Sequence, residues 1–238
     1  MSHDTRNAVR LTGWTAILGG IVACLHVTLD FVLLGDDFAM SLHGASMLAL
    51  PTETRDLFRW AMLADILGFY LPVIVIAGYL WHRFRNEAGA WGDMAALAIA
   101  IYVVVGVSGA AIQMSVLNPL AHLHQGGDEA TRAAAETIWA ALATASQKGL
   151  WWIEGPLVLF WGTVVGNQLA RAGWGRSVLI PLKIVGWSFA LFFVFEFFPS
   201  MDTLSELTGL IIILVFPLWM LLFGWALLRQ PASTPARA

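Results

Sequence analysis

Hydrophobic residues along this chain gather into long runs that short polar stretches separate. Six of these runs come close to the length of about 20 residues that a helix needs to cross a bilayer. They cover residues 11–34, 58–81, 94–117, 146–168, 178–198 and 206–228. The pattern predicts an all-α protein, a polytopic transmembrane bundle of six helices.

The connections between the runs are short and polar, and none has the composition of a domain linker. We therefore expect residues 1–230 to form a single six-helix transmembrane domain and residues 231–238 to form a disordered cytoplasmic tail. The connection at 35–56 is long enough for a short helix, and its apolar positions at 38–50 are expected to lie flat on the membrane.

Composition supports the bilayer as the surroundings of the protein. Hydrophobic residues make up 58% of the chain and charged residues only 12%, whereas soluble domains carry about 25% charged residues. So few charges cannot cover a water-facing surface, so lipid is the expected partner. The net charge of −3 indicates no nucleic-acid partner, and the single cysteine, Cys24, excludes an intrachain disulfide.

Lysine and arginine residues give the orientation, because loops rich in them stay in the cytoplasm. Nine lie before the first run, after the sixth, or in the connections on that same side. The other side carries three, namely Arg55, Arg59 and Arg132. This asymmetry predicts that both termini are cytoplasmic and that the protein is a multi-pass protein of the bacterial inner membrane.

Polar side chains inside the apolar runs are the strongest functional signal. A charge at membrane depth costs about 3 kcal/mol or more unless it is paired or hydrated, so such residues should face the bundle interior. With the predicted orientation, all of them fall in the outer half of the membrane. This predicts a polar cavity that opens toward the periplasm above an apolar floor. The residues are His26, Asp30, Asp65, Gln113, Gln147, Lys148, Glu154 and Glu196.

Asp65 and Glu154 lie deepest and are the candidate general acid and base. His26 and Asp30 are four residues apart on one helical face and form a candidate supporting dyad. Both could instead be a structural hydrogen-bonded pair. The candidate substrate-binding residues are Trp151, Gln113, Gln147 and Glu196, although Glu196 and Lys148 lie close enough to the interface to be simply hydrated.

Aromatic residues flank two of the acids. Trp151 and Trp152 precede Glu154, and five phenylalanines surround Glu196. A carboxylic acid in a dry aromatic cavity can hold a proton and donate it, and aromatic faces stabilise positive charge. An enzyme that protonates an isoprenoid-like molecule needs this combination. The same phenylalanines could also simply face lipid.

A metal site is the less favoured interpretation of the polar residues. His26, Asp30, Asp65 and Glu154 are possible ligand types, and His43, His122 and His124 lie on outer connections. The chain has no HExxH or ExxH motif and no paired cysteines. We therefore predict no metal, and the sequence indicates no particular cofactor.

Three local patterns carry a family resemblance. They are Arg10-x-x-Gly13-Trp14, a Leu57-Phe58-Arg59 stretch followed by Asp65, and Trp151-Trp152-x-Glu154-Gly155-Pro156. In these patterns, and over most of its length, the chain resembles a group of bacterial six-helix membrane proteins known as domain of unknown function four-three-eight-six. The resemblance implies a helical bundle and no activity.

Two functional classes follow, and the sequence leaves open whether the protein is an enzyme. The first is a membrane-embedded enzyme acting on a lipophilic, isoprenoid-like small molecule. The second is a proton- or cation-coupled transporter or a small-ligand-binding membrane protein. A transporter needs a path to both faces, and the apolar inner half favours an enzyme or a binding pocket. Polar residues that only join helices are a third interpretation.

Overall fold

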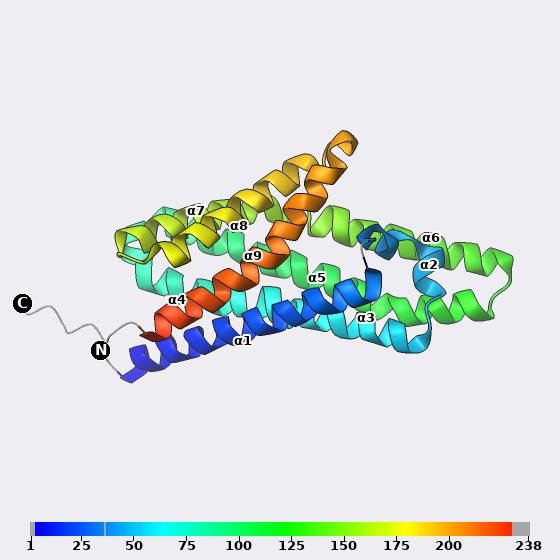
Figure 1. The fold of residues 1–238 in the computed structure, drawn as a ribbon, viewed down its shortest axis with the longest axis horizontal. Helices are drawn as coiled ribbons and strands as arrows, with labels where there is room; N and C mark the ends of the chain where they lie inside the picture. The colour runs from blue at the N-terminus through cyan, green and yellow to red at the C-terminus, as the bar shows by residue number, and fades with distance from the viewer. Residues whose placement is uncertain (1–2, 36, 230–238) are drawn as a thin grey trace, which may run out of the picture.

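The computed structural model describes residues 3–35 and 37–229, and this part of the chain is helical almost throughout, without a β-strand (Figure 1). The predicted tail at 231–238 lies outside the described residues. The long helices are α1 (His3–Leu34), α3 (Thr52–Asp65), α4 (Leu71–Ala88), α5 (Ala90–Gly126), α6 (Glu129–Ala145), α7 (Glu154–Arg171), α8 (Arg176–Phe195) and α9 (Asp202–Arg229).

Shorter elements join or interrupt these helices. A π-helical turn, η2 (Ile66–Tyr70), connects α3 to α4, and a second, η3 (Ser146–Leu150), follows α6. The 3-10 helix η1 (Phe38–Leu42) and the short α2 (Gly44–Leu48) follow α1, and η4 (Pro199–Met201) precedes α9. Gly89 and Gly173 end α4 and α7 with φ angles of 53° and 77°, which favour glycine because it has no Cβ atom.

Five helical segments of the described chain are long and apolar enough to cross a membrane. They are Arg6–Leu34, Thr52–Ala88, Ala90–Gly126, Arg176–Phe195 and Pro199–Arg229. These segments confirm the prediction of a helical chain with several helices that are long and apolar enough to span a membrane. The predicted run at 146–168 is not among them, because a turn at residues 151–153 interrupts it and because α7 begins with Glu154 and ends in polar residues.

The described ends of the chain lie together. The start of α1 and the end of α9 occupy the same end of the bundle, with the α4–α5 and α7–α8 turns (Figure 1). Glycine residues allow α1 and α9 to approach closely, since a Cβ atom on Gly224 would lie 2.6 Å from the carbonyl oxygen of Gly13. This arrangement places both ends of the described chain on one side of the bundle.

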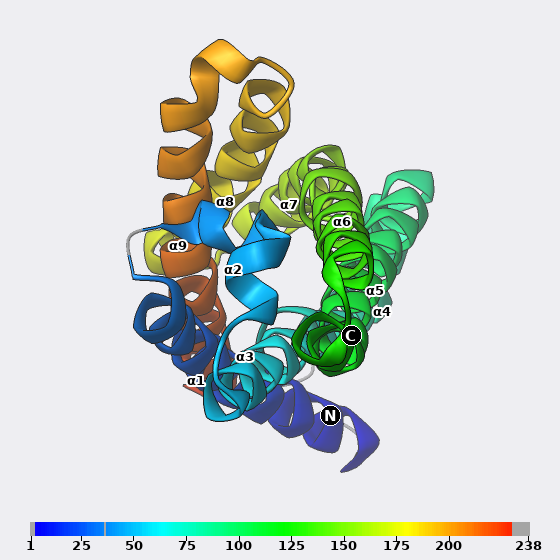
Figure 2. The same ribbon diagram turned by 90° about the vertical axis from the view of Figure 1, so that its right-hand side faces the viewer.

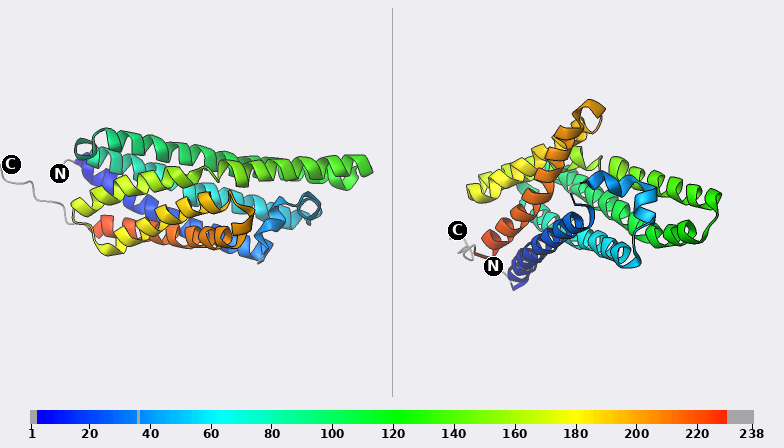
Figure 3. Two further views of the ribbon diagram at one scale, coloured as in Figure 1. Left: turned by 90° about the horizontal axis from the view of Figure 1, so that it is seen from above. Right: turned by 45° about the vertical axis from the view of Figure 1, so that its right-hand side comes forward.

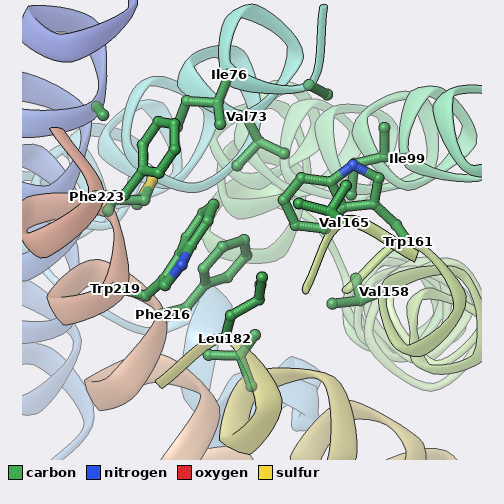
Figure 4. Close-up of a cluster of buried hydrophobic side chains, with 14 of the residues drawn as sticks. Val73, Ile76, Ile99, Val158, Trp161, Val165, Leu182, Phe216, Trp219 and Phe223 are labelled. Carbon is green, nitrogen blue, oxygen red and sulfur yellow. The ribbon is translucent and has the colours of Figure 1, made fainter. Parts of the chain in front are cut away.

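A cluster of large apolar side chains fills the interior toward this end. Phe216, Trp219 and Phe223 of α9 meet residues from α4, α5, α7 and α8 there (Figure 4). The rings of Trp161 and Trp219 pack edge to face, with centroids 5.7 Å apart. The cluster is an apolar floor for the interior of the bundle.

The opposite end extends beyond the other helices. Helix α5 has 37 residues and is about 55 Å long at 1.5 Å per residue, which exceeds a hydrocarbon core of about 30 Å. Its far end pairs with α6 (Figure 3). The Ala-rich stretch that forms α6 is a separate helix that leads through η3 toward α7.

The segment expected to lie flat on the membrane packs into the bundle instead. Helix α2 packs against α5 and α6 (Figure 2), and Met47 and Leu48 are fully buried there. The indole Nε1 of Trp139 donates a hydrogen bond to the Ser41 carbonyl oxygen at 2.9 Å. Apolar positions alone did not reveal this, because a face buried against protein and one buried in lipid have the same composition.

Candidate functional site

A cavity of about 380 Å³ lies above the apolar floor. Seven of the eight predicted site residues line it, and Gln113 does not. The acidic and basic side chains on its wall come from α1, α3, η3, α7, the end of α8, and α9. They are His26, Asp30, Asp65, Lys148, Glu154, Glu196 and Glu206.

His26 connects two of the acids. Its Nδ1–H donates to the Ala61 carbonyl oxygen at 3.0 Å. Its Nε2 lies 3.2 Å from Oδ2 of Asp30, one turn further along α1, and 3.7 Å from Oδ1 of Asp65 on α3. Because a carbonyl oxygen can only accept, Nδ1 carries a proton. Any further proton is shared between Nε2 and the two carboxyl groups.

Asp65 and Glu154 converge on the same cavity from different helices. Asp65 is 5% exposed and Glu154 is 4% exposed. Both side chains lie on the cavity wall, together with the buried side chain of Tyr70. The two deepest acids of the sequence therefore belong to one site.

Local helix geometry brings the first of these acids into place. Asp65 ends α3 just before the π-helical turn η2, and Pro72 follows in the first turn of α4 without an N–H to donate. Gly68 within η2 touches α1, since a Cβ atom there would lie 2.5 Å from the Ala23 nitrogen. This contact brings His26, one turn beyond Ala23, next to Asp65. π-Helical turns are frequent at functional sites.

A second irregularity presents Glu154. The π-helical turn η3 is followed by three non-helical residues, and Glu154 opens α7 directly after them. Pro156 fits this first helical turn because backbone N–H groups there have no intrahelical acceptor. Both deep acids thus lie where a helix begins or ends inside the bundle.

One buried oxygen on each of three acids lacks a hydrogen-bond partner within the described residues. These atoms are Asp30 Oδ1, Asp65 Oδ2 and Glu154 Oε1, and we call them the open oxygens. An acceptor left without a donor away from water costs about 1–3 kcal/mol. Because all three residues line the cavity, a bound molecule that donates hydrogen bonds could satisfy them there.

The wall formed by η3 contains a polar network. Gln147 Nε2 donates to Gln113 Oε1 at 2.8 Å and to Ser41 Oγ at 3.0 Å. Gln113 is fully buried behind Gln147 and is off the cavity wall. Gln113 thus meets the cavity only through Gln147, and its predicted binding role stays a prediction.

At the mouth of the cavity, Lys148 pairs with Glu196 across helices, with Nζ and Oε2 3.4 Å apart. Glu196 also accepts a hydrogen bond from Ser205 Oγ at 2.6 Å. Lys148 is half-exposed, so this pair has access to water.

The aromatic wall differs in part from the expectation. Trp151 lines the cavity and donates from Nε1 to the Gly106 carbonyl oxygen at 3.2 Å. Of the phenylalanines around Glu196, only Phe192 lies on the wall; Phe197 and Phe198 are exposed. The outward direction of these two rings follows from their place at the end of α8.

Further wall residues were missed by sequence reasoning. Tyr70 and Tyr102 are buried and line the cavity, and the Tyr102 hydroxyl donates to the Phe69 carbonyl oxygen at 3.2 Å. The signal available in the sequence was a tyrosine hydroxyl near the middle of an apolar run. Tyrosine is rare here, with three in the chain.

The histidines considered as metal ligands are dispersed. His124 on the projecting end of α5 pairs with Glu136 of α6, with Nε2 and Oε1 2.8 Å apart. Within residues 3–35 and 37–229, the His, Cys, Asp and Glu side chains form no group of three or more placed to hold a metal ion.

Comparison with known protein families, curated proteins and solved structures finds no match to this chain. The resemblance to the six-helix family of unknown function therefore stays a prediction. The functional argument depends on the geometry of the cavity.

Proposed function

We propose that this integral membrane protein is an enzyme that moves protons to and from a lipophilic small molecule in the acidic cavity. Asp65 and Glu154 would be the acid and base. The observation that carries the proposal is the convergence of these two buried carboxyl groups, from α3 and α7, in one cavity of about 380 Å³. Two positioned carboxyl groups can exchange roles as proton donor and acceptor.

An isoprenoid-like substrate fits this chemistry. One carboxyl group donates its proton to a carbon–carbon double bond, which forms a C–H bond and leaves a carbocation. The other carboxylate removes a proton from a neighbouring carbon, and the C–H electron pair becomes the new double bond. Atoms and charge balance without a further reactant. The rings of Phe69, Tyr102 and Phe189 on the wall would stabilise the intermediate positive charge.

The membrane arrangement is part of the proposal. We propose that α7 is the sixth crossing helix, since it packs between α5 and α8, and that both termini are cytoplasmic in a bacterial inner membrane. The cavity would then open toward the periplasm. The low number of lysine and arginine residues at that end supports this orientation.

Proton- or cation-coupled transport is the second candidate, and one observation favours it. His26, Asp30 and Asp65 form a connected titratable group within apolar helices, as proton relays do. Transport also requires a path past Phe216 and Trp219, which are fully buried in the apolar floor. A cavity closed on this side supports the enzyme over the transporter.

The proposal can be tested by deuterium exchange. Membranes containing the protein are incubated with a lipid extract in D₂O, and mass spectrometry identifies any lipophilic compound that gains deuterium. We expect wild-type protein to produce such a compound and Asp65→Asn and Glu154→Gln to lose it. Glu53→Gln, an exposed acid outside the cavity, is the matched control.

The outcomes separate the two candidates. Deuterium gain that the control retains and both cavity variants lose supports the enzyme. A second outcome is that no compound gains deuterium, while the wild-type protein drives pH-dependent uptake of a proton or cation into vesicles and the cavity variants abolish this uptake. In that case, transport replaces the enzyme as the proposed function. Thermal unfolding of each variant shows whether a loss reflects misfolding.

A further inference from the structure

We infer, on the basis of the proposed function, that the substrate is a membrane amphiphile with a small head group that donates hydrogen bonds. It would enter the cavity sideways from the bilayer, between the outer parts of α1 and α9. This inference specifies the substrate class and the route, which the acid–base chemistry alone leaves open.

The two helices that flank the route meet at one end and separate at the other. Gly20 of α1 packs against Leu221 of α9, and Gly13 packs against Leu228. Beyond this seam α1 turns toward α3, and α9 rises away from it, as both views show (Figures 1 and 2). Residues from these separated parts, including Asp30 and Leu210, line the cavity together.

The rim between the two helices is apolar. Leu34 of α1 and Leu210 and Ile213 of α9 lie on the cavity wall and are partly or fully exposed. The neighbouring Leu207 and Leu214 are more than half exposed. An exposed apolar surface on a membrane-spanning helix faces lipid. Of the charged residues on the wall, Lys148 and Glu196 lie on η3 and at the end of α8, and Glu206 lies on α9 one turn before Leu210.

The deep wall requires a hydrogen-bond donor. The open oxygens of Asp30, Asp65 and Glu154 accept no hydrogen bond from any described residue. A hydroxyl or ammonium head group could donate to them, whereas a carboxylate head group would be repelled by the acids. The charge of the wall therefore selects the head group, and the apolar rim selects the tail.

The size of the cavity agrees with a molecule that is only partly enclosed. A volume of about 380 Å³ is near the lower end of ligand pockets, which span about 300–1,000 Å³. A long hydrocarbon chain would exceed this space and continue through the gap into the bilayer.

Photolabelling in lipid nanodiscs tests the inference. The probes are a long-chain alcohol and the matching amine and carboxylic acid, each with a photoreactive group in the tail. We expect the alcohol and amine to label peptides around Leu34 and Leu210–Ile213, and the carboxylic acid to label them about tenfold less, which corresponds to about 1.4 kcal/mol.

One substitution reduces the cavity, and a second obstructs the gap. Gly209→Leu projects into the cavity wall where a Cβ atom has ordinary contacts, 3.7 Å from the Phe192 ring. Leu210→Trp enlarges the rim itself. We expect each to reduce labelling about tenfold. The controls are Gly78→Leu, an exposed helix position with no atom near its Cβ, and Leu218→Trp, exposed two turns further along α9 and off the cavity wall.

The inference is overturned if the labelling yield is unchanged in both Gly209→Leu and Leu210→Trp. It is also overturned if the carboxylic acid labels the protein as strongly as the alcohol. If Glu154→Gln still abolishes deuterium exchange in that case, the proposed function stands and only the route is wrong. If the gap is labelled as expected but no compound exchanges deuterium, the amphiphile site stands and the proposed function fails.

Discussion

The imidazole Nε2 of His26 lies 3.7 Å from Oδ1 of Asp65, and this contact joins the last third of α1 to the last residue of α3. The contact depends on Gly68, whose missing side chain lets η2 touch α1 at Ala23. The polar pair of His26 and Asp65 and the backbone contact of Gly68 with Ala23 thus lie a few residues apart and support each other. Together they shape the deep wall of the cavity.

His26→Phe should weaken the fold and abolish deuterium exchange. The ring would keep its packing beside Phe69, 5.8 Å away, while Asp30 Oδ2 and Asp65 Oδ1 lose their nearest partner. We expect a loss of about 1–3 kcal/mol in the free energy of unfolding, measured by denaturant titration in detergent. Thr28→Val on the exposed face of α1 is the control and should change it by less than about 0.5 kcal/mol.

Gly68→Ala should destabilise the protein because the added methyl group meets backbone. Its Cβ would lie 2.5 Å from the Ala23 nitrogen, which a rotamer change cannot relieve. Overpacking of this kind costs about 1–3 kcal/mol. Gly78→Ala on α4, with open space around its Cβ, should leave stability unchanged or raise it by up to about 1 kcal/mol. Equal thermal midpoints for the two variants would contradict the close contact.

Arg55→Lys should be destabilising although the charge is kept. Arg55 is 1% exposed, and its guanidinium group donates to the side chains of Asn118 and Thr52 at 3.1 and 3.2 Å and to the Leu50 carbonyl oxygen. Lysine lacks the planar fork that reaches several acceptors, so we expect a loss of about 1–3 kcal/mol.

The control for this change is Arg59→Lys. Arg59 is about half-exposed and pairs with Asp56 at 3.3 Å, and such surface pairs contribute less than about 1 kcal/mol. Urea or detergent unfolding curves that coincide for both variants would show that Arg55 is not a structural residue.

Acid should loosen the start of α6. Hydrogen bonds from the side chain and backbone N–H of Thr131 lower the pKa of Asp128, which caps this helix. A carboxylate whose pKa is lower in the folded state stabilises the fold above its unfolded pKa of about 3.9. That contribution disappears as the pH falls through the lower, folded value.

Hydrogen exchange at the first amides of α6 measures this effect. We expect protection relative to the rest of α6 to fall on acidification in the wild type and to stay constant in Asp128→Asn. Asparagine caps a helix as well as aspartate does but does not titrate here. A constant profile in both proteins would exclude Asp128 as the titrating cap.

Much of the site could be predicted from the sequence, because a polar residue inside an apolar run is stable mainly when it faces the interior of the bundle. This argument placed His26, Asp30, Asp65 and Glu154 in the interior, and all four line one cavity. It did not separate Gln113 from these four, since burial alone does not distinguish a wall residue from one behind the wall. It also overlooked Tyr70 and Tyr102, whose rings match their apolar surroundings.

The sequence by itself determined a helical chain with several membrane-spanning segments. Run length and apolarity are local properties, and a backbone in lipid must satisfy its hydrogen bonds within each helix. Only the tertiary structure decided which polar groups meet. Spacing along one helix relates His26 to Asp30, but the rotation of α1 against α3 depends on the contact between Gly68 and Ala23. Such contacts join residues distant in sequence, so no pattern within a single helix encodes them.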